Sequence, residues 1–406
     1  MSGQSSSIPA VSSNPEATVN VVGSPSASSP ILGSLISDDS SSIRTYTPLK
    51  TISQGPFGSV HFCHWHSIFP PCVDPPPLPT IARYGVGRDL VALKVIPMNS
   101  GQDPNKWKEL EVLRNLPPHP NVVFLYDYFF TLADRKLHLA FGAMEGNLQQ
   151  LIQARRSRSF AGALLSSIFY QLNLALDHIH SHHYFHRDLV PENVLVTTTG
   201  LFDYPTFPIP LVTTSVASDT LREKDVVVII KLADFGLARD TRSGHPYTEY
   251  VTTRWYRAPE VLLSSPHYTS AVDMWAFGAI IAEMLNLRPI FPGTDSLNQI
   301  ATICDVLGNP SNEYRLDAAG RLINGGSWPD GLALAHSVGF QFPEVLRRPL
   351  SSFFSSAVPT SLVQLMEEFL VFNPQHRLTS SSSLQHPYFL HTAPYRNSLP
   401  PPVLDS

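Results

Sequence analysis

Residues 186–193 place a carboxylate and an amide at a spacing that suits metal-assisted chemistry. The segment reads HRDLVPEN, and Asp234 precedes a Phe-Gly pair further along the chain. Asp188 can accept a proton, while Asn193 and Asp234 offer oxygen ligands of the kind that Mg²⁺ takes in proteins. In-line transfer of a phosphoryl group from ATP needs a base, metal ligands and little other covalent chemistry. The pattern therefore predicts phosphoryl transfer.

A glycine-containing turn is a second candidate for phosphate contact. Residues 53–60 read SQGPFGSV and are expected at the turn of the first hairpin. Gly55 and Gly58 have no Cβ, so backbone N–H groups there can approach phosphate oxygens. Taken alone, two glycines in a hairpin turn are more often only a turn. Pro56 also removes one N–H donor.

Lys94 ends an apolar strand that reads VALK over 91–94, and a helix-like segment follows. An ion pair between Lys94 and Glu109 would hold the ammonium group against the α- and β-phosphates. Glu111 is the alternative partner. Glu109 is preferred because Leu110 and Leu113 flank it on the side expected to pack inward.

Residues 247–260, YTEYVTTRWYRAPE, form the most specific run. Thr248 and Tyr250 stand in a polar loop, and phosphates on both hydroxyls could order that loop by binding arginines. The arginines expected to bind them are Arg187, Arg254 and Arg257. The alternative is an ordinary exposed turn without modification. Glu260 at the end of the run is predicted to form a buried pair with Arg377.

Composition limits the class of protein. The net charge of −5 gives no reason to expect nucleic acid or an acidic membrane surface as partner. Three scattered cysteines, Cys63, Cys72 and Cys304, favour a reducing cytosol or nucleus over a disulfide framework. The longest apolar run, 274–285, contains a glutamate and is too short to span a bilayer. We expect it to be a buried core helix.

The periodicity changes along the chain. Residues 1–43 are rich in Ser and Pro and are expected to be a disordered tail, with a second tail at 391–406. Strand-like runs from about 44 to 145 surround one helical segment, 105–116. Helical periodicity dominates from about 146 to 390, with expected helices at 163–180, 271–285, 297–307 and 361–372. Two stretches, 67–89 and 197–225, are expected to be insertions at hairpin turns.

Together these motifs resemble a eukaryotic protein kinase over residues 46–389. The WYRAPE run is similar to the branch that holds cyclin-dependent and mitogen-activated kinases. The flanks of Thr248-Glu249-Tyr250 and the run LRPIFPG at 287–293 resemble the male germ cell-associated kinase family, which has a similar Thr-x-Tyr triplet. The resemblance implies an α+β bilobal fold: a small antiparallel-sheet lobe and a large helical lobe, with nucleotide bound between them.

The resemblance also assigns roles to residues. Asp188 would be the catalytic base, Lys94 the ATP lysine with Glu109 as its partner, and Asn193 and Asp234 the magnesium ligands. Thr253 is included in the catalytic group. The nucleotide-binding set comprises Ile52, Ser53, Gly55, Gly58, Val60, Ala92, Lys94, Phe141, Ala143, Met144 and Asn147. Phe141 would lie at the back of the adenine pocket, and Asn147 near the ribose.

Three positions depart from the family pattern. Val190 replaces a lysine that contacts the γ-phosphate, Ser53 replaces a loop glycine, and Gly142 replaces the usual hinge glutamate. An apolar side chain at 190 forfeits a charge-assisted hydrogen bond of about 1.5–3 kcal/mol.

The sequence therefore predicts a Ser/Thr protein kinase that uses ATP and Mg²⁺ and acts on protein substrates. An upstream kinase would activate it at Thr248 and Tyr250. The alternative is a nucleotide-binding pseudokinase that serves as a scaffold, which Val190 and Ser53 favour.

Overall fold

The computed structural model describes residues 43–55, 58–69, 90–199, 227–241, 254–311, 313–320 and 322–396, together with a short strand at 19–22. The chain divides into two compact units, one of residues 1–105 and 125–143 and the other of residues 106–124 and 144–406. Within the described ranges, no helix is long and apolar enough to cross a membrane.

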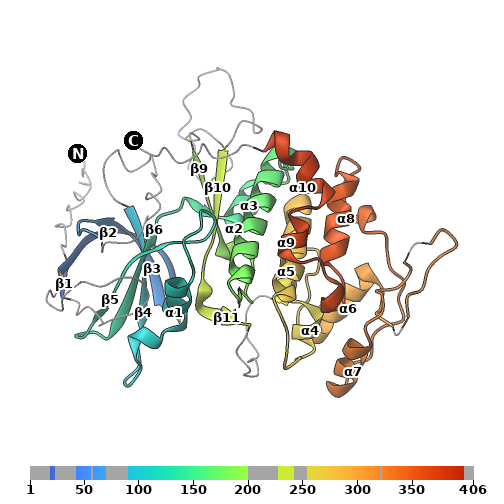
Figure 1. Cartoon of the computed structure of the whole chain (residues 1–406), viewed down its shortest axis with the longest axis horizontal. Helices are drawn as coiled ribbons and strands as arrows, with labels where there is room; N and C mark the ends of the chain where they lie inside the picture. The colour runs from blue at the N-terminus through green and yellow to red at the C-terminus, as the bar shows by residue number, and fades with distance from the viewer. Residues whose placement is uncertain are drawn as a thin grey trace, which may run out of the picture. The chain divides into compact units, whose positions relative to one another are not determined.

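The first unit is built on an antiparallel sheet with the strand order β1-β2-β3-β4-β6-β5 (Figure 1). The strands are β1 (Val19–Val22), β2 (Ile43–Gly55), β3 (Gly58–Trp65), β4 (Leu90–Pro97), β5 (Leu125–Thr131) and β6 (Lys136–Gly142). β1 and β5 consist largely of β-branched and aromatic residues, which favour pleated, half-buried positions. Gly55 pairs with Gly58 at the end of the β2–β3 hairpin, where the sequence predicted a turn.

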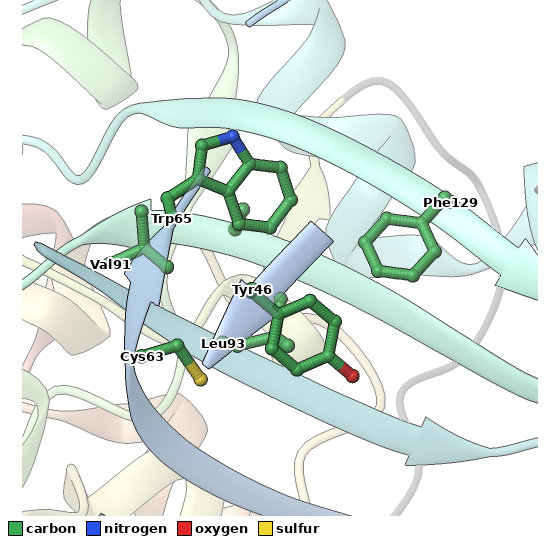
Figure 2. Close-up of a cluster of buried hydrophobic side chains, with 7 residues drawn as sticks. Tyr46, Cys63, Trp65, Val91, Leu93 and Phe129 are labelled. Atoms are coloured by element: carbon green, nitrogen blue, oxygen red, sulfur yellow. The ribbon is translucent and has the colours of Figure 1, made fainter. Parts of the chain in front are cut away.

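One face of this sheet is covered by a hydrophobic cluster (Figure 2). Its buried members are Tyr46, Cys63, Trp65, Val91, Leu93, Phe129 and Ala140. The Trp65 ring lies parallel to the rings of Tyr46 and Phe69, with centroids 6.1 and 5.4 Å apart. Large aromatic side chains give a small sheet the buried apolar area it needs.

The second unit is mainly helical. Its helices are α1 (Lys108–Asn115), α2 (Leu148–Ala154), α3 (Gly162–Ser181), α4 (Pro259–Leu262), α5 (Ala271–Asn286), α6 (Ser296–Leu307), α7 (Pro329–Ser337), α8 (Thr360–Phe369), α9 (Ser380–Ser383) and α10 (Pro387–Thr392). Every residue of α5 from Val272 to Met284 is buried, so the apolar run forms a core helix as predicted. The α+β arrangement expected from the sequence is confirmed.

Short strands and 3₁₀ turns in the second unit contain or flank the predicted site residues Asp188, Asn193 and Asp234. The strands are β7 (Gly146–Asn147), β8 (Tyr184–Phe185), β9 (Val194–Thr199), β10 (Val227–Leu232) and β11 (Arg239–Asp240). The turns used below are η3 (Pro191–Asn193), η5 (Phe235–Leu237) and η6 (Arg254–Tyr256). β9 pairs with β10, and β3 pairs with β4. Both expected insertions therefore join adjacent antiparallel strands.

The structure corrects the sequence analysis in three places. Val19–Val22 forms a strand paired with residues 43–46, although this region was expected to be a disordered tail. Its three valines have high β-propensity, which the Ser- and Pro-rich surroundings masked. The segment expected as a helix over 105–116 begins with a 3₁₀ turn at 104–106, and α1 starts at Lys108. This helix groups with the second unit rather than with the sheet.

Candidate active site

Asp188, Asn193 and Asp234 meet at one end of the β9–β10 hairpin. Asn193 Nδ2 donates to the main-chain oxygen of Asp188 at 2.8 Å and to its carboxylate Oδ2 at 3.2 Å. Leu232 pairs with Val194, and the Ala233 N–H donates to Asn193 O at 2.9 Å. Asp188 and Asn193 precede β9, and Asp234 follows β10, so the three predicted residues lie at the same end of the hairpin.

A buried carboxylate anchors the segment before Asp188. Asp273, 1% exposed in α5, accepts from the main-chain N–H groups of His186 and Arg187 at 2.7 and 2.8 Å. His180 Nε2 lies 2.9 Å from Asp273 Oδ2. Burial alone would raise the pKa of Asp273, but the hydrogen bond from His180 and the neighbouring His186 hold it below its ordinary value. Asp273 therefore anchors the main chain just before Asp188.

The contacts of His186 are structural. It is fully buried, its Nε2–H donates to Ala233 O at 2.8 Å, and its ring meets Phe235 edge-on with centroids 5.3 Å apart. These contacts tie the segment before Asp188 to the residues on either side of Asp234.

Two predicted site residues hold left-handed backbone conformations. Arg187 has φ 71° and Asp234 has φ 63°. Such conformations cost a non-glycine residue roughly 1–3 kcal/mol and are found where surrounding contacts impose them, often at functional sites. A Cβ on Gly236 would lie 3.3 Å from Asp234 Oδ1, so a larger residue would crowd that carboxylate.

A buried amide pair that the sequence analysis missed fixes the strand leading to Asp234. Asn121 Nδ2 donates to Gln171 Oε1 at 2.9 Å and to Ile230 O at 3.0 Å. Gln171 Nε2 donates to Val228 O at 2.8 Å, and its Oε1 accepts from Ile230 N–H at 3.1 Å. The sequence did offer one signal of this pair, because Gln171 is a polar residue at an apolar position of α3.

Three basic side chains, Lys108, Arg187 and Arg239, form a cluster in the second unit. The Arg187 guanidinium donates to the Tyr268 hydroxyl and to Leu237 O. Burial and the nearby charges of Arg239 and Arg187 lower the pKa of Lys108. Among the described residues, the buried Arg239 Nε has no hydrogen-bond partner. Lys108 and Arg239 were not among the residues predicted from the sequence.

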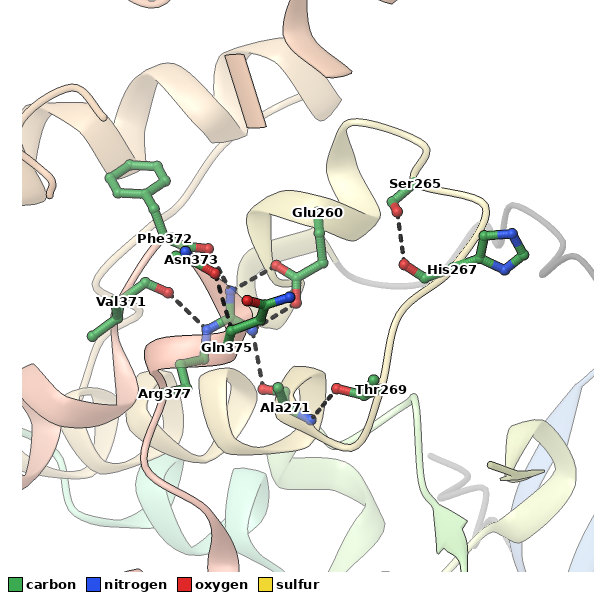
Figure 3. Close-up of polar contacts among 10 residues, drawn as sticks. All are labelled: Glu260, Ser265, His267, Thr269, Ala271, Val371, Phe372, Asn373, Gln375 and Arg377. Carbon is green, nitrogen blue, oxygen red and sulfur yellow. Dashed lines mark hydrogen bonds and ion pairs between the residues drawn. The ribbon is translucent and has the colours of Figure 1, made fainter. Parts of the chain in front are cut away.

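The predicted pair of Glu260 and Arg377 is confirmed (Figure 3). The two side chains form a bidentate pair with distances of 2.6 and 2.7 Å, and both are buried. Arg377 also donates to the carbonyls of Val371, Phe372 and Ala271. These bonds satisfy the buried guanidinium and join α4 to the turn before α9.

Glu283 is a buried acid within the apolar helix α5. It is 2% exposed, and its Oε2 accepts from the Tyr256 hydroxyl at 2.6 Å. Burial raises the pKa of Glu283 to about 7; the Tyr256 hydrogen bond lowers it and the charge of Glu192 raises it. This pair connects the turn η6 to the core of the second unit.

The oxygen ligands offered by Asn193 and Asp234 at the end of the hairpin fit a magnesium ion. Because Asn193 Nδ2 donates to Asp188, its Oδ1 is the atom left for a metal, and Asp234 adds a carboxylate. Among the described residues no cluster of three or more His, Cys, Asp or Glu side chains could hold a metal ion. Two protein oxygens suit Mg²⁺, which completes its shell with water and substrate phosphates.

The first unit carries most of the predicted nucleotide residues. Val60 pairs with Lys94 and Ala92 pairs with Phe141, so these four residues share one face of the sheet. Ser53 pairs with Val60, and Ile52 precedes it in β2. Gly58 has φ 134°, and a Cβ there would lie 2.3 Å from Val95 O. Only glycine suits that position.

The partner of Lys94 stays a prediction. Lys94 lies in β4 of the first unit, and Glu109 lies in α1 of the second. Glu109 is 2% exposed while Glu111 is exposed, which agrees with the expectation that Glu109 is on the inward side of the helix.

The remaining predicted residues divide between the units. Phe141 and Ala143 are buried in the first unit, and Met144 is buried in the second. Asn147 caps α2: its Oδ1 accepts from Gln150 N–H at 2.9 Å, and Gln150 Oε1 accepts from Asn147 N–H. This capping role is independent of the predicted ribose contact.

Some predicted residues lie outside the part of the chain that the structure describes. They are Pro56, Cys72, Thr248, Tyr250 and Thr253. Arg254 and Arg257, both half-buried, lie in and just after η6, and the Arg257 N–H donates to Arg254 O at 3.0 Å.

Asp188, Asn193 and Asp234 are the side-chain types that phosphoryl transfer needs, and the fold brings their segments to the same end of one hairpin. The sequence matches the family described as "Protein kinase domain" over residues 84–389. The chain belongs to the protein kinase domain family, and the resemblance expected from its motifs is confirmed.

Several relatives refine this placement. Serine/threonine-protein kinase MAK of Mus musculus is 34% identical over 346 residues, covering 85% of this chain and 45% of that protein. Cyclin-dependent kinase F-4 of Oryza sativa subsp. japonica is 40% identical over 282 residues, covering 70% and 51%. Meiosis induction protein kinase IME2/SME1 of Saccharomyces cerevisiae is 33% identical over 308 residues, covering 75% and 46%. The chain spans about half the length of these relatives.

Proposed function

We propose that this chain is an active protein serine/threonine kinase that uses ATP and Mg²⁺ to phosphorylate protein substrates. The observation that carries the proposal is the hydrogen bond from Asn193 to the Asp188 carboxylate at the end of the hairpin that also presents Asp234. A carboxylate held this way can accept the proton of a substrate hydroxyl.

In this proposal the other predicted residues bind and orient the nucleotide. Lys94 binds the α- and β-phosphates, and the backbone of the Gly55–Gly58 turn approaches the phosphates. Asn193 Oδ1 and Asp234 hold Mg²⁺, which neutralises charge on the phosphates when bound.

A second candidate function is a nucleotide-binding scaffold without turnover. Val190, 9% exposed, supports it because no charged group from this position meets the γ-phosphate. Asp188, Asn193 and Asp234 are nevertheless all present, and their arrangement favours the active kinase.

A radiolabelled-ATP transfer assay on the purified 406-residue chain tests the choice. Asp188→Asn keeps the size of the side chain and removes the base, so transfer to Ser/Thr peptides should fall about 10²–10⁴-fold. Lys94→Met should also abolish transfer while the melting temperature stays near that of the wild type. Equal transfer by wild type and Asp188→Asn would refute the assignment. Nucleotide binding without transfer by either protein would establish the scaffold function.

We further propose that an upstream kinase activates the chain by phosphorylation at Thr248 and Tyr250. The basic cluster of Lys108, Arg187 and Arg239 supports this, because positive groups held close together favour an anion. A cytoplasmic or nuclear location is also proposed, and the free buried thiols of Cys63 and Cys304 are consistent with it.

A further inference from the structure

Three histidine rings pack against one another at the end of helix α3. His178 lies in the last turn of the helix, and His182 follows it as the C-cap residue. The ring of His178 stacks on the ring of His119 with centroids 4.6 Å apart, and the centroid of the His182 ring lies 4.5 Å from that of His178. All three residues belong to the second unit. None of them has a role in the proposed phosphoryl transfer.

The spacing of His178 and His182 suits a metal ion. The two residues are four positions apart and so share one face of the helix. The His182 N–H donates to His178 O at 3.3 Å, so the helical hydrogen-bond pattern continues through the pair. Two histidines at this spacing on a helix bind Zn²⁺ in known metal sites. An ion bonded to both rings at about 2.0–2.1 Å joins nitrogens up to about 4 Å apart, which the 4.5 Å between the ring centroids permits.

Hydrogen bonds to carbonyl oxygens fix which nitrogen of each ring carries the proton. His178 Nε2–H donates to Pro117 O at 2.9 Å, and His182 Nδ1–H donates to His178 O at 2.7 Å. A neutral imidazole has one N–H and one lone pair, so the lone pairs are on His178 Nδ1 and His182 Nε2. Both rings are half-buried, and among the described residues neither lone pair has a partner or is cut off from solvent. An ion can therefore reach both nitrogens.

The surroundings keep His178 neutral near pH 7. Burial lowers its pKa below the ordinary value of 6.5, although the hydrogen bond to Pro117 and the charge of Asp177 act in the opposite direction. A metal ion binds the neutral ring, so no proton has to leave His178 first. The negative charge of Asp177 also favours a cation beside His178. The opposing charge of Lys231 acts on His119, whose pKa burial lowers to about 4.

We propose that His178 Nδ1 and His182 Nε2 bind one Zn²⁺ ion, with water at its remaining positions. Among the described residues no group of three His, Cys, Asp or Glu side chains could hold a metal ion, so the site has two protein ligands. His119 supports them: its Nδ1 accepts from Asn121 N–H at 3.2 Å, and its ring holds the ring of His178 in place. The bound ion joins two successive turns and stabilises the end of α3. The site does not depend on the proposed kinase function.

Calorimetric titration of the untagged 406-residue chain with ZnCl₂ measures binding, with excess Mg²⁺ present to occupy the proposed magnesium ligands. His178→Gln and His182→Asn keep an N–H donor for each carbonyl and remove the imidazole lone pair. Each should weaken Zn²⁺ binding at least tenfold, because loss of an outer-shell partner alone costs about 10–100-fold. The matched control is His183→Asn, which removes an exposed neighbouring histidine outside the stacked rings and should bind Zn²⁺ as the wild type does.

Electron paramagnetic resonance with one equivalent of Cu²⁺, which imidazole also binds, identifies the ligands directly. The wild type should show coupling to two imidazole nitrogens, and each single variant should show coupling to one. Thermal melts establish that the variants are folded, and His182→Asn alone tests the pair if His178→Gln does not fold. A Zn²⁺ affinity that neither variant changes would overturn the site. A Cu²⁺ spectrum that is the same in the wild type and the variants would overturn it as well.

Discussion

At the scale of single residues, we expect Val190 to limit the rate of the proposed reaction. Its main-chain oxygen accepts from Asn193 N–H at 3.0 Å, so the backbone of the turn is held whatever side chain is present. The side chain is 9% exposed and supplies no charge. A position with a fixed backbone and a replaceable side chain is suited to a gain-of-function test.

Val190→Lys should raise kcat about tenfold or more, and kcat should change more than the KM for ATP. A lysine there would stabilise charge that develops on the transferred group, and an interaction stronger in the transition state raises kcat. Steady-state kinetics with ATP varied give both constants. Val190→Met, of similar length without charge, is the control and should stay at the wild-type rate. An unchanged or lower kcat in Val190→Lys would show that another group already fills the role.

Glu283 makes stability depend on pH. Its pKa of about 7 lies above the ordinary value of 4.5, so the folded chain favours the protonated form. The contribution to stability is therefore complete below about pH 4.5 and is lost as the pH rises through 7. Glu283→Gln keeps an acceptor for Tyr256 and removes the ionisation. It should be about 1–3 kcal/mol more stable than the wild type at pH 8, with little difference at pH 4.5.

Urea unfolding of the wild type and Glu283→Gln at both pH values measures this difference. Glu192→Gln is the comparison, because the charge of exposed Glu192 raises the pKa of Glu283. That variant should reduce the pH dependence without removing it. Identical pH profiles for wild type and Glu283→Gln would contradict the prediction.

At the scale of elements, periodicity predicted the long helices well. The expected 163–180 and 271–285 are observed as Gly162–Ser181 and Ala271–Asn286, because an apolar period sustained over several turns leaves few alternatives. The helix expected over 361–372 ends at Phe369. The prediction was too long because buried Leu370 and Phe372 continue the apolar pattern beyond the last helical turn. An apolar pattern records burial, and burial does not require a helix.

The motifs predicted which residues would carry the chemistry but not what holds them. Asp188 and Asn193 are close in sequence, so their spacing was informative. Asn121, Gln171 and strand β10 meet only through tertiary contacts. A buried glutamine can be suspected from its position in an apolar period. Its partner, 50 residues away, cannot be identified from that position.

Gln171→Met should destabilise the second unit by about 2–4 kcal/mol. It leaves Asn121 Nδ2 with one acceptor fewer, and Val228 O and Ile230 N–H lose the Gln171 amide as their partner. Since β10 leads to Asp234, the concentration of Mg²⁺ needed for half-maximal activity should rise as well. Urea unfolding and magnesium titration measure the two effects. Gln153→Met, an exposed position in α2, is the control. A loss below about 0.5 kcal/mol would show that the network is dispensable.

At the scale of the whole molecule, the proposed reaction draws on both units. The first supplies Lys94 and the glycine turn, and the second supplies Asp188, Asn193 and Asp234. Neither unit alone holds the full set. A switch that acts on the second unit alone could therefore control activity, and the basic cluster of Lys108, Arg187 and Arg239 belongs to that unit.

Phosphorylation at Thr248 and Tyr250 should raise activity at least tenfold. Each phosphate adds about −1.5 to −2 charge and three acceptor oxygens. Arg239 Nε, which has no partner among the described residues, and Lys108, whose pKa neighbouring cations lower, would both gain from an anion. Mass spectrometry should find both hydroxyls modified in the active protein, and Thr248→Ala with Tyr250→Phe should lose the gain in kcat/KM. The matched control, Tyr247→Phe with Thr252→Ala, changes the same residue types in the same run and should keep it. Full activity in the Thr248 and Tyr250 double variant would place the switch elsewhere in the chain.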